Sequence, residues 1–151
     1  MEIIQSTFFA LIASFAFMIV FEVRGKALLI GSIGGAISQL SLELGQLVEY
    51  FNFLVPYFFA ALILTLYSEV MARVIKKPAT VFLIGALFPL VPGTGIYQSM
   101  VYFVEGQQGA FFRELQQTLA ITGTLAMGIM IVSVIFRNFR LRSYFKEEEQ
   151  N

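Results

Sequence analysis

The sequence predicts an all-α integral membrane protein with about five transmembrane helices, because its apolar residues gather in runs long enough to cross a bilayer. Of the 151 residues, 58% are hydrophobic and 13% are charged, whereas about 25% of a soluble domain is charged. Mean hydropathy is +0.78. The length accommodates about five spans with short loops, so we expect one compact membrane domain.

The expected helices are apolar runs separated by polar segments. The runs are approximately residues 3–21, 27–47, 53–72, 79–104 and 116–136. Between them lie FEVRGK, a short polar patch around Glu49 and Asn52, RVIKKP and EGQQGAFFREL. Residues 1–136 are therefore expected to form the transmembrane domain. Residues 137–151 are expected to form a solvated, partly disordered cytoplasmic tail whose arginines contact anionic lipid.

The basic residues predict the orientation of the chain. Basic residues follow the first, third and fifth runs and are nearly absent from the connections on the opposite side. Those that follow the three runs are Arg24, Lys26, Arg73, Lys76, Lys77, Arg137, Arg140 and Arg142. By the positive-inside rule, the N-terminus is expected outside and the C-terminus in the cytoplasm. The stretch MEIIQSTFF has no Lys or Arg, unlike the start of a signal peptide, so we expect the first span to be retained.

Small residues recur at helical spacing in the second and fifth runs. Gly31 and Gly35 lie four residues apart in the second run, and Thr124 and Gly128 repeat the spacing in the fifth. Apolar burial gives no drive between helices in lipid, so such stripes favour close backbone packing. We therefore expect these four residues to pack helices together. Contact of the nearby hydroxyl groups with a substrate is the alternative.

The segment FPLVPGTGIYQ interrupts the fourth run. Pro89 and Pro92 lack an N–H, and Gly93 and Gly95 tolerate backbone conformations that other residues avoid. We therefore expect the fourth helix to be broken over Pro89–Gly95. Freed backbone groups cost several kcal/mol each in hydrocarbon, so the break is expected to line a cavity or to be sealed by neighbouring helices.

A broken membrane helix has two half-helix ends that attract opposite charges. The first half ends in exposed carbonyl groups, which suit a cation, and the second begins with exposed N–H groups, which suit a carboxylate. A zwitterionic amino acid matches both ends. The residues expected to bind it are Pro89, Pro92, Gly93, Thr94, Gly95, Tyr97 and Gln98. A proline kink that serves packing alone is the alternative.

The composition excludes several classes of function. The chain has no cysteine and no histidine, so thiol chemistry, haem attachment and most zinc or copper sites are excluded, and no metal or cofactor is expected. The spans carry no nucleophile or carboxylate pair typical of an enzyme. Net charge is zero with scattered basic residues, which argues against nucleic-acid binding. A transporter subunit and a structural membrane scaffold remain as the candidate functions.

Several segments resemble one known family. The stretches GSIGG, YSEVMARVIKKPATVF and FPLVPGTGIYQSM are similar to those of the small subunit of the split threonine/serine exporters of bacteria, over nearly the whole chain. The resemblance implies a multi-pass protein of the bacterial plasma membrane that exports small hydroxylated amino acids, driven by the proton gradient. It also implies a larger membrane subunit as partner; self-association, and export of other small carboxylates, stay open.

Glu69 is the candidate proton carrier. A proton-coupled transporter needs a group that titrates, histidine is absent, and a carboxylate inside a span is a functional candidate by default. Arg73 lies four residues further on, on the same helix face, so an interfacial ion pair is the alternative. Glu43 and Glu49 flank the outer end of the second span, where vestibule lining or solvation is expected.

Overall fold

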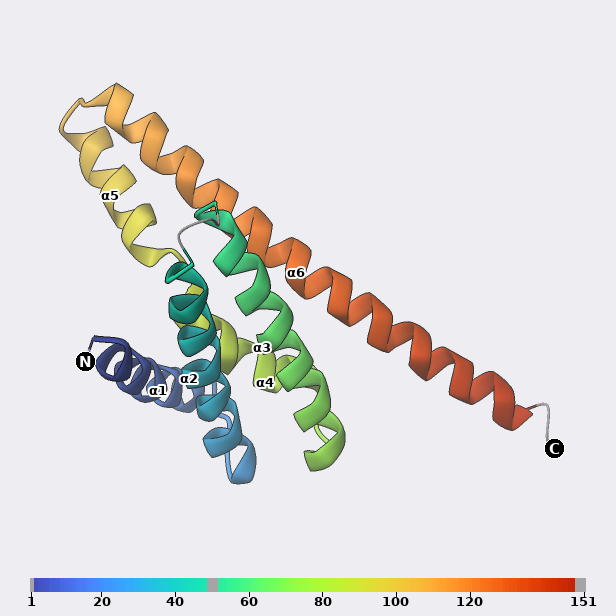
Figure 1. Cartoon of the computed structure of the whole chain (residues 1–151). Helices are drawn as coiled ribbons and strands as arrows, with labels where there is room; N and C mark the ends of the chain where they lie inside the picture. Colours follow the sequence, from blue (N-terminus) through green and yellow to red (C-terminus); the bar gives the residue numbers. More distant parts are fainter. Residues whose placement is uncertain (1, 49–51, 149–151) are drawn as a thin grey trace.

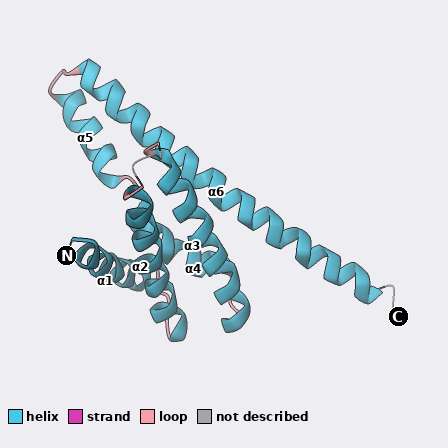
Figure 2. Cartoon of the chain, viewed as in Figure 1, coloured by secondary structure: helices cyan, strands magenta, loops and turns pink. Residues whose placement is uncertain are grey.

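The structure, a computed structural model, describes residues 2–48 and 52–148, with side chains up to Asn138. This part of the chain is helical and contains no strand (Figure 1, Figure 2). The helices are α1 (Glu2–Val20), α2 (Lys26–Gln46), α3 (Leu54–Ile75), α4 (Ala79–Leu87), the short 3-10 helix η1 (Phe88–Leu90), α5 (Gly93–Val104) and α6 (Gln108–Glu148). The predicted all-α class is confirmed. Glu49 lies outside the described residues.

Four helices, α1, α2, α3 and α6, are long and apolar enough to cross a membrane. The pair formed by 79–90 and 93–104 gives a fifth candidate span, bent by 52°. The prediction of about five spans, with the fourth broken, is therefore confirmed. The largest boundary difference is in α6, which begins at Gln108 and continues past the expected tail boundary at 136/137 without a break.

The break has a local cause in its second proline. Phe88, before Pro89, keeps helical angles, whereas Val91, before Pro92, is extended with φ −64° and ψ 126°. A proline disfavours helical angles in the residue before it, so the helix must stop at Val91. Gly93 and Gly95 lie within α5, and neither has a positive φ. The expectation that these glycines supply unusual backbone angles is therefore wrong; the prolines account for the break.

One carbonyl group near the break is satisfied from another helix. The hydroxyl of Ser38 on α2 donates to the carbonyl oxygen of Ala86 at 2.6 Å. Ala86 lies in the last turn of α4, where carbonyl groups lack partners in their own helix. Ser38 is fully buried, so the neighbouring span seals this part of the break.

Glycines bring α1, α2 and α4 close together. An added methyl group at Gly35 would overlap Ser14 of α1 and lie 3.2 Å from the carbonyl oxygen of Gly85 on α4. A methyl group at Gly31 would overlap the side chain of Met18, and one at Gly85 would lie 3.1 Å from the carbonyl oxygen of Gly31. The backbones of α2 and α4 are therefore in close contact at these glycines.

A second close contact joins α3 and α6, which lie side by side and run in the same direction (Figure 1). A methyl group at Gly128 would lie 2.6 Å from Cβ of Ala61 and 3.1 Å from the carbonyl oxygen of Phe58. The hydroxyl of Thr124 donates to the carbonyl of Ala120 in its own helix at 2.8 Å. The adjoining core contains Leu42, Ala60, Ala61, Leu64, Ala86, Leu90 and Leu125.

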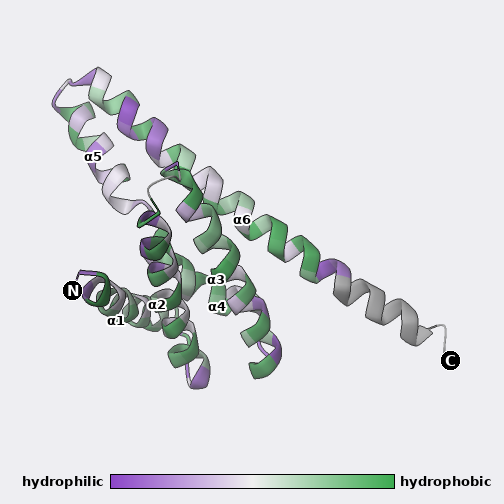
Figure 3. Cartoon of the chain, viewed as in Figure 1, coloured by the Kyte–Doolittle hydropathy of each residue, from purple (hydrophilic) through white to green (hydrophobic). Residues whose placement is uncertain are grey.

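The bent pair ends in a hairpin. After the break, the chain continues through α5, and the first turns of α6 then fold back along it (Figure 1). The rings of Phe103 and Phe111 lie 5.4 Å apart in this hairpin. Several residues in these first turns of α6 are hydrophilic (Figure 3). This arrangement brings the start of α5, the first turns of α6, the end of α2 and the start of α3 together.

Candidate functional site

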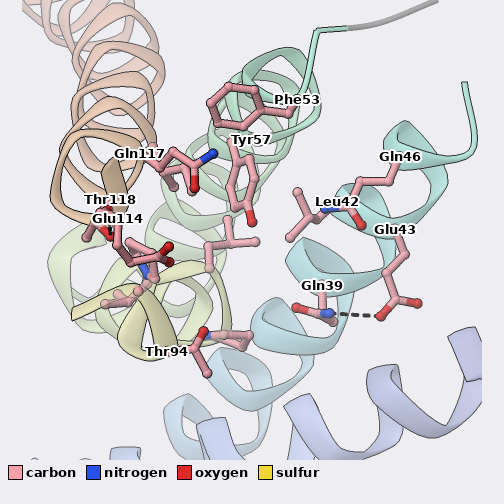
Figure 4. Close-up of a pocket in the computed structure, with 16 residues that line it drawn as sticks. Gln39, Leu42, Glu43, Gln46, Phe53, Tyr57, Thr94, Glu114, Gln117 and Thr118 are labelled. Atoms are coloured by element: carbon pink, nitrogen blue, oxygen red, sulfur yellow. Dashed lines mark hydrogen bonds between the residues drawn. The ribbon is translucent and has the colours of Figure 1, made fainter. Parts of the chain in front are cut away.

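A cavity of about 530 Å³ lies where the break meets these helix ends (Figure 4). Its volume falls in the range of small-molecule sites. The break contributes six lining residues, which are Pro89, Leu90, Val91, Pro92, Thr94 and Gly95. The other helices contribute Gln39, Leu42, Glu43, Gln46, Phe53, Tyr57, Glu114, Gln117, Thr118 and Ile121. Amide, hydroxyl and carboxylate groups therefore face one space.

The structure brings some of the expected binding residues together and separates others. Pro89, Pro92, Thr94 and Gly95 line the cavity. Gly93, Tyr97 and Gln98 do not line it. A side chain at Gly93 would meet nothing within 4 Å, and Gln98 is exposed. Tyr97 is 70% exposed and borders a separate hollow of about 290 Å³ with Met100, Val101, Val104 and Glu105.

The N-terminus of α5 gives the cavity a partly positive wall. The N–H of Gly93 donates to the carbonyl of Val91 at 2.7 Å, and the N–H of Ile96 donates to that of Pro92 at 3.2 Å. The N–H groups of Thr94 and Gly95, in the first turn, have no acceptor within the helix. The helix dipole adds partial positive charge there. This wall can receive an anionic group.

Among the residues that the structure describes, two carboxylates line the same cavity, and no lysine or arginine does. Oε1 of Glu43 accepts a hydrogen bond of 2.8 Å from Nε2 of Gln39, and Oε2 is buried with no donor in reach among the described residues (Figure 4). The carboxylate of Glu114 lies near α5, since its Oε1 is 3.6 Å from the position of a methyl group on Gly95. The cavity therefore combines a positive helix end with acidic side chains.

Sequence reasoning gave these two carboxylates no binding role, although their spacing carries a signal. Gln39, Glu43 and Gln46 repeat at intervals of four and three along α2, which places them on one helix face. Glu114, Gln117, Thr118 and Ile121 follow the same rule along α6. Pro89 and Leu90, at the end of the first half-helix, line the cavity together with these acidic side chains, and the cation site predicted at that helix end stays a prediction.

Glu69 lies away from the cavity. It is 12 residues from Tyr57 on α3, or about 18 Å along the helix. Its Oε2 pairs with Nη1 of Arg73 at 3.6 Å, and the guanidinium of Arg73 lies 4.4 Å from the ring centre of Phe136. Proton coupling by Glu69 stays a prediction.

Comparison with known proteins gives one family match. The family model described as Threonine/Serine exporter, ThrE matches residues 6–135. The match runs from α1 into α6 and includes every residue that lines the cavity. No solved structure matches this chain.

Proposed function

Because this chain belongs to the threonine/serine exporter family, we propose that it is a subunit that exports threonine and serine from the cytoplasm and binds them in the cavity at the break. The observation that carries this proposal is the pairing of a positive helix end with acidic side chains in one cavity without Lys or Arg. A zwitterionic amino acid has both charges that such a cavity attracts.

The lining residues give each part of the substrate a partner. The carboxylate of the amino acid faces the free N–H groups of Thr94 and Gly95, and its ammonium group faces the acidic side of the cavity. The hydroxyls of Thr94 and Thr118 and the amide of Gln117 lie at the same wall and are suited to bond the substrate hydroxyl. Thr118 already donates to the carbonyl of Glu114 at 2.8 Å, so it remains an acceptor.

A larger membrane subunit is proposed as the partner. Outside its contact with α6, α5 presents exposed apolar side chains, with Tyr97, Met100, Phe103 and Val104 each more than half exposed. Helix faces of this kind pack against lipid or against another protein. We propose that the partner covers α5; a second copy of this chain is the alternative.

The proposed orientation places the cavity toward the outside. The cavity lies at the C-terminal end of α2 and the N-terminal end of α3, and the positive-inside rule puts these ends on the external side. A proton gradient directed inward would then supply protons to the cavity from the side where the substrate leaves. We propose this gradient as the energy source, with Glu69 as the sequence-based candidate carrier.

Single cysteines are expected to report this orientation, because the chain has none of its own. In intact cells, a membrane-impermeant thiol reagent should label Gln107→Cys, in the turn before α6, and should leave Lys76→Cys unlabelled until the membrane is opened. Both positions are exposed, so access decides the result. Labelling of Lys76→Cys from outside would reverse the proposed topology.

Transport is tested in inside-out membrane vesicles that contain this chain and the larger membrane protein that co-purifies with it. An imposed proton gradient, acidic inside, should drive accumulation of threonine and serine, and vesicles lacking this chain should show none. Leu29→Phe, at a position 60% exposed, serves as the matched control and should transport normally. Movement of other small carboxylates alone supports the alternative substrate class, and no movement by an assembled complex supports a structural scaffold.

A further inference from the structure

We propose that the carboxylate of Glu43 is a shared site for a proton and for the ammonium group of the substrate, so that each excludes the other. This inference rests on the proposed function and adds a coupling residue that the sequence reasoning did not select. The surroundings of Glu43 on α1, α2, α3 and α6 support this assignment.

The two oxygens of Glu43 have different surroundings. Gln39, one turn earlier on α2, donates to Oε1 at 2.8 Å and so fixes the direction of the carboxylate (Figure 4). Oε2 is buried, and no donor among the described residues reaches it. A buried charged oxygen without a partner is costly. Oε2 is therefore the atom that gains most from a proton or a cation.

The position of Glu43 on its helix favours the same ligands. Glu43 lies in the last turn of α2, which contains no basic residue. The C-terminal end of a helix carries partial negative charge, which attracts a cation such as the ammonium group of the substrate.

The neighbouring helices supply no competing cation. The titratable groups that share the cavity with Glu43 are Tyr57 of α3 and Glu114 of α6. On the other side, α1 packs antiparallel on α2, with Met18 against Gly31 and Ser14 against Gly35. The surroundings of Glu43 are thus polar and negative, with no Lys or Arg lining the cavity.

Glu114 takes a different part in the same cavity. Its carboxylate lies beside Gly95 in the first turn of α5, a helix end that carries partial positive charge. Glu43 lies at a helix end that carries partial negative charge, which attracts cations. The proton and the ammonium group are therefore assigned to Glu43.

Exclusive occupancy of one carboxylate produces exchange. When Glu43 holds a proton on Oε2, it is a neutral acid and gives no charge to pair with an ammonium group. When the substrate binds, its ammonium group pairs with the ionised carboxylate, and the proton has left. The proton returns only after the substrate departs, so one proton enters the site for each amino acid released, as a gradient-driven exporter requires.

The test measures threonine binding to the assembled transporter as a function of pH. In the wild type, the dissociation constant for threonine should rise as pH falls, by up to about tenfold per pH unit, because a proton competes with the ligand. The probe without an ammonium group is 3-hydroxybutyrate, the deaminated analogue of threonine. Its binding should show no such rise.

Glu43→Gln is expected to weaken threonine binding about tenfold or more, since it removes a charged partner, and to abolish the pH dependence. Binding of the deaminated analogue should stay within about twofold, which also reports that the variant is folded. The matched control is Glu105→Gln, in the turn where Glu105 accepts a hydrogen bond from Gln107, and it should keep the wild-type pH profile.

Several outcomes would overturn the assignment. Threonine binding by Glu43→Gln with native affinity and native pH dependence contradicts it, as does loss of the pH dependence in Glu69→Gln. If Glu43→Gln does not assemble, binding to the wild type still tests the assignment. An equal pH dependence for threonine and its deaminated analogue would rule out competition between a proton and the ammonium group. These results leave the proposed function standing; absence of threonine and serine binding by the assembled wild type contradicts that function instead.

Discussion

Gly35→Leu is expected to reduce recovery of the folded protein strongly. Even a methyl group at this position would overlap Ser14 and lie 3.2 Å from the carbonyl oxygen of Gly85, so a leucine forces α2 away from both α1 and α4. Overpacking by a few methylene groups costs about 1–3 kcal/mol, and the stability of a domain is only about 5–15 kcal/mol. The measurement is the yield of monodisperse protein after detergent extraction, with a thermal unfolding curve for any that remains.

Three further variants separate this effect from a general intolerance of substitution in α2. Gly31→Ala should cost less than Gly35→Ala, because its methyl group meets the movable end of the Met18 side chain, whereas that at Gly35 meets Ser14 and backbone. Leu29→Phe, on the exposed side of α2, should leave yield and melting temperature unchanged. Native yield for Gly35→Leu would contradict the close packing of α1, α2 and α4.

The spans could be predicted because hydropathy alone determines them in a bilayer. The five apolar runs gave the helices to within a few residues, except in α6, which begins before its run and continues beyond it. At its start, Arg113, Glu114, Gln116 and Gln117 make the first turns polar, so a search for apolar runs begins too late. These turns pair with α5 instead of crossing hydrocarbon as a bare apolar helix. A tertiary contact of this kind leaves no trace in hydropathy.

The position of the break was predictable, but the partners of its free backbone groups were not. Pro92 determines where the helix stops, since it forces Val91 into extended angles. The carbonyl of Ala86, by contrast, is satisfied by Ser38, which is 48 residues away in sequence. Local sequence rules cannot pair residues at that separation.

For the same reason, only part of the candidate site could be predicted from the sequence. Residues of the break carry an unusual composition and were selected, whereas Glu43 and Glu114 look like ordinary residues near helix ends. Only the fold shows that the end of α2 and the start of α6 face the same cavity. The polar stripe of α2, at Gln39, Glu43 and Gln46, was the available signal.

The structure also distinguishes Gly93 from Gly95, for which the sequence predicted the same role. Gly95 lies against Thr118 and near Glu114, while a side chain at Gly93 would point into open space. Both residues have helical angles without positive φ, so neither substitution is opposed by backbone strain. The difference between them is therefore a difference in surroundings alone, which makes the pair a controlled experiment on the cavity.

Gly95→Leu is expected to reduce threonine binding by at least about tenfold, or about 1.4 kcal/mol, in protein that still assembles. Even a methyl group at Gly95 would overlap Oγ1 of Thr118 in the cavity wall, so a leucine would displace the first turn of α5, where the substrate carboxylate meets the N–H groups of Thr94 and Gly95. Gly93→Leu should bind within about twofold of the wild type, because its side chain leaves the cavity free. Thr94→Val deletes one hydroxyl at constant volume and should weaken threonine binding about fivefold, near 1 kcal/mol, with a smaller effect on alanine. The measurement is equilibrium binding to purified complex, normalised to the fraction assembled. Native affinity in assembled Gly95→Leu would mean that the break is a packing kink and that the substrate binds elsewhere, most plainly in the partner subunit.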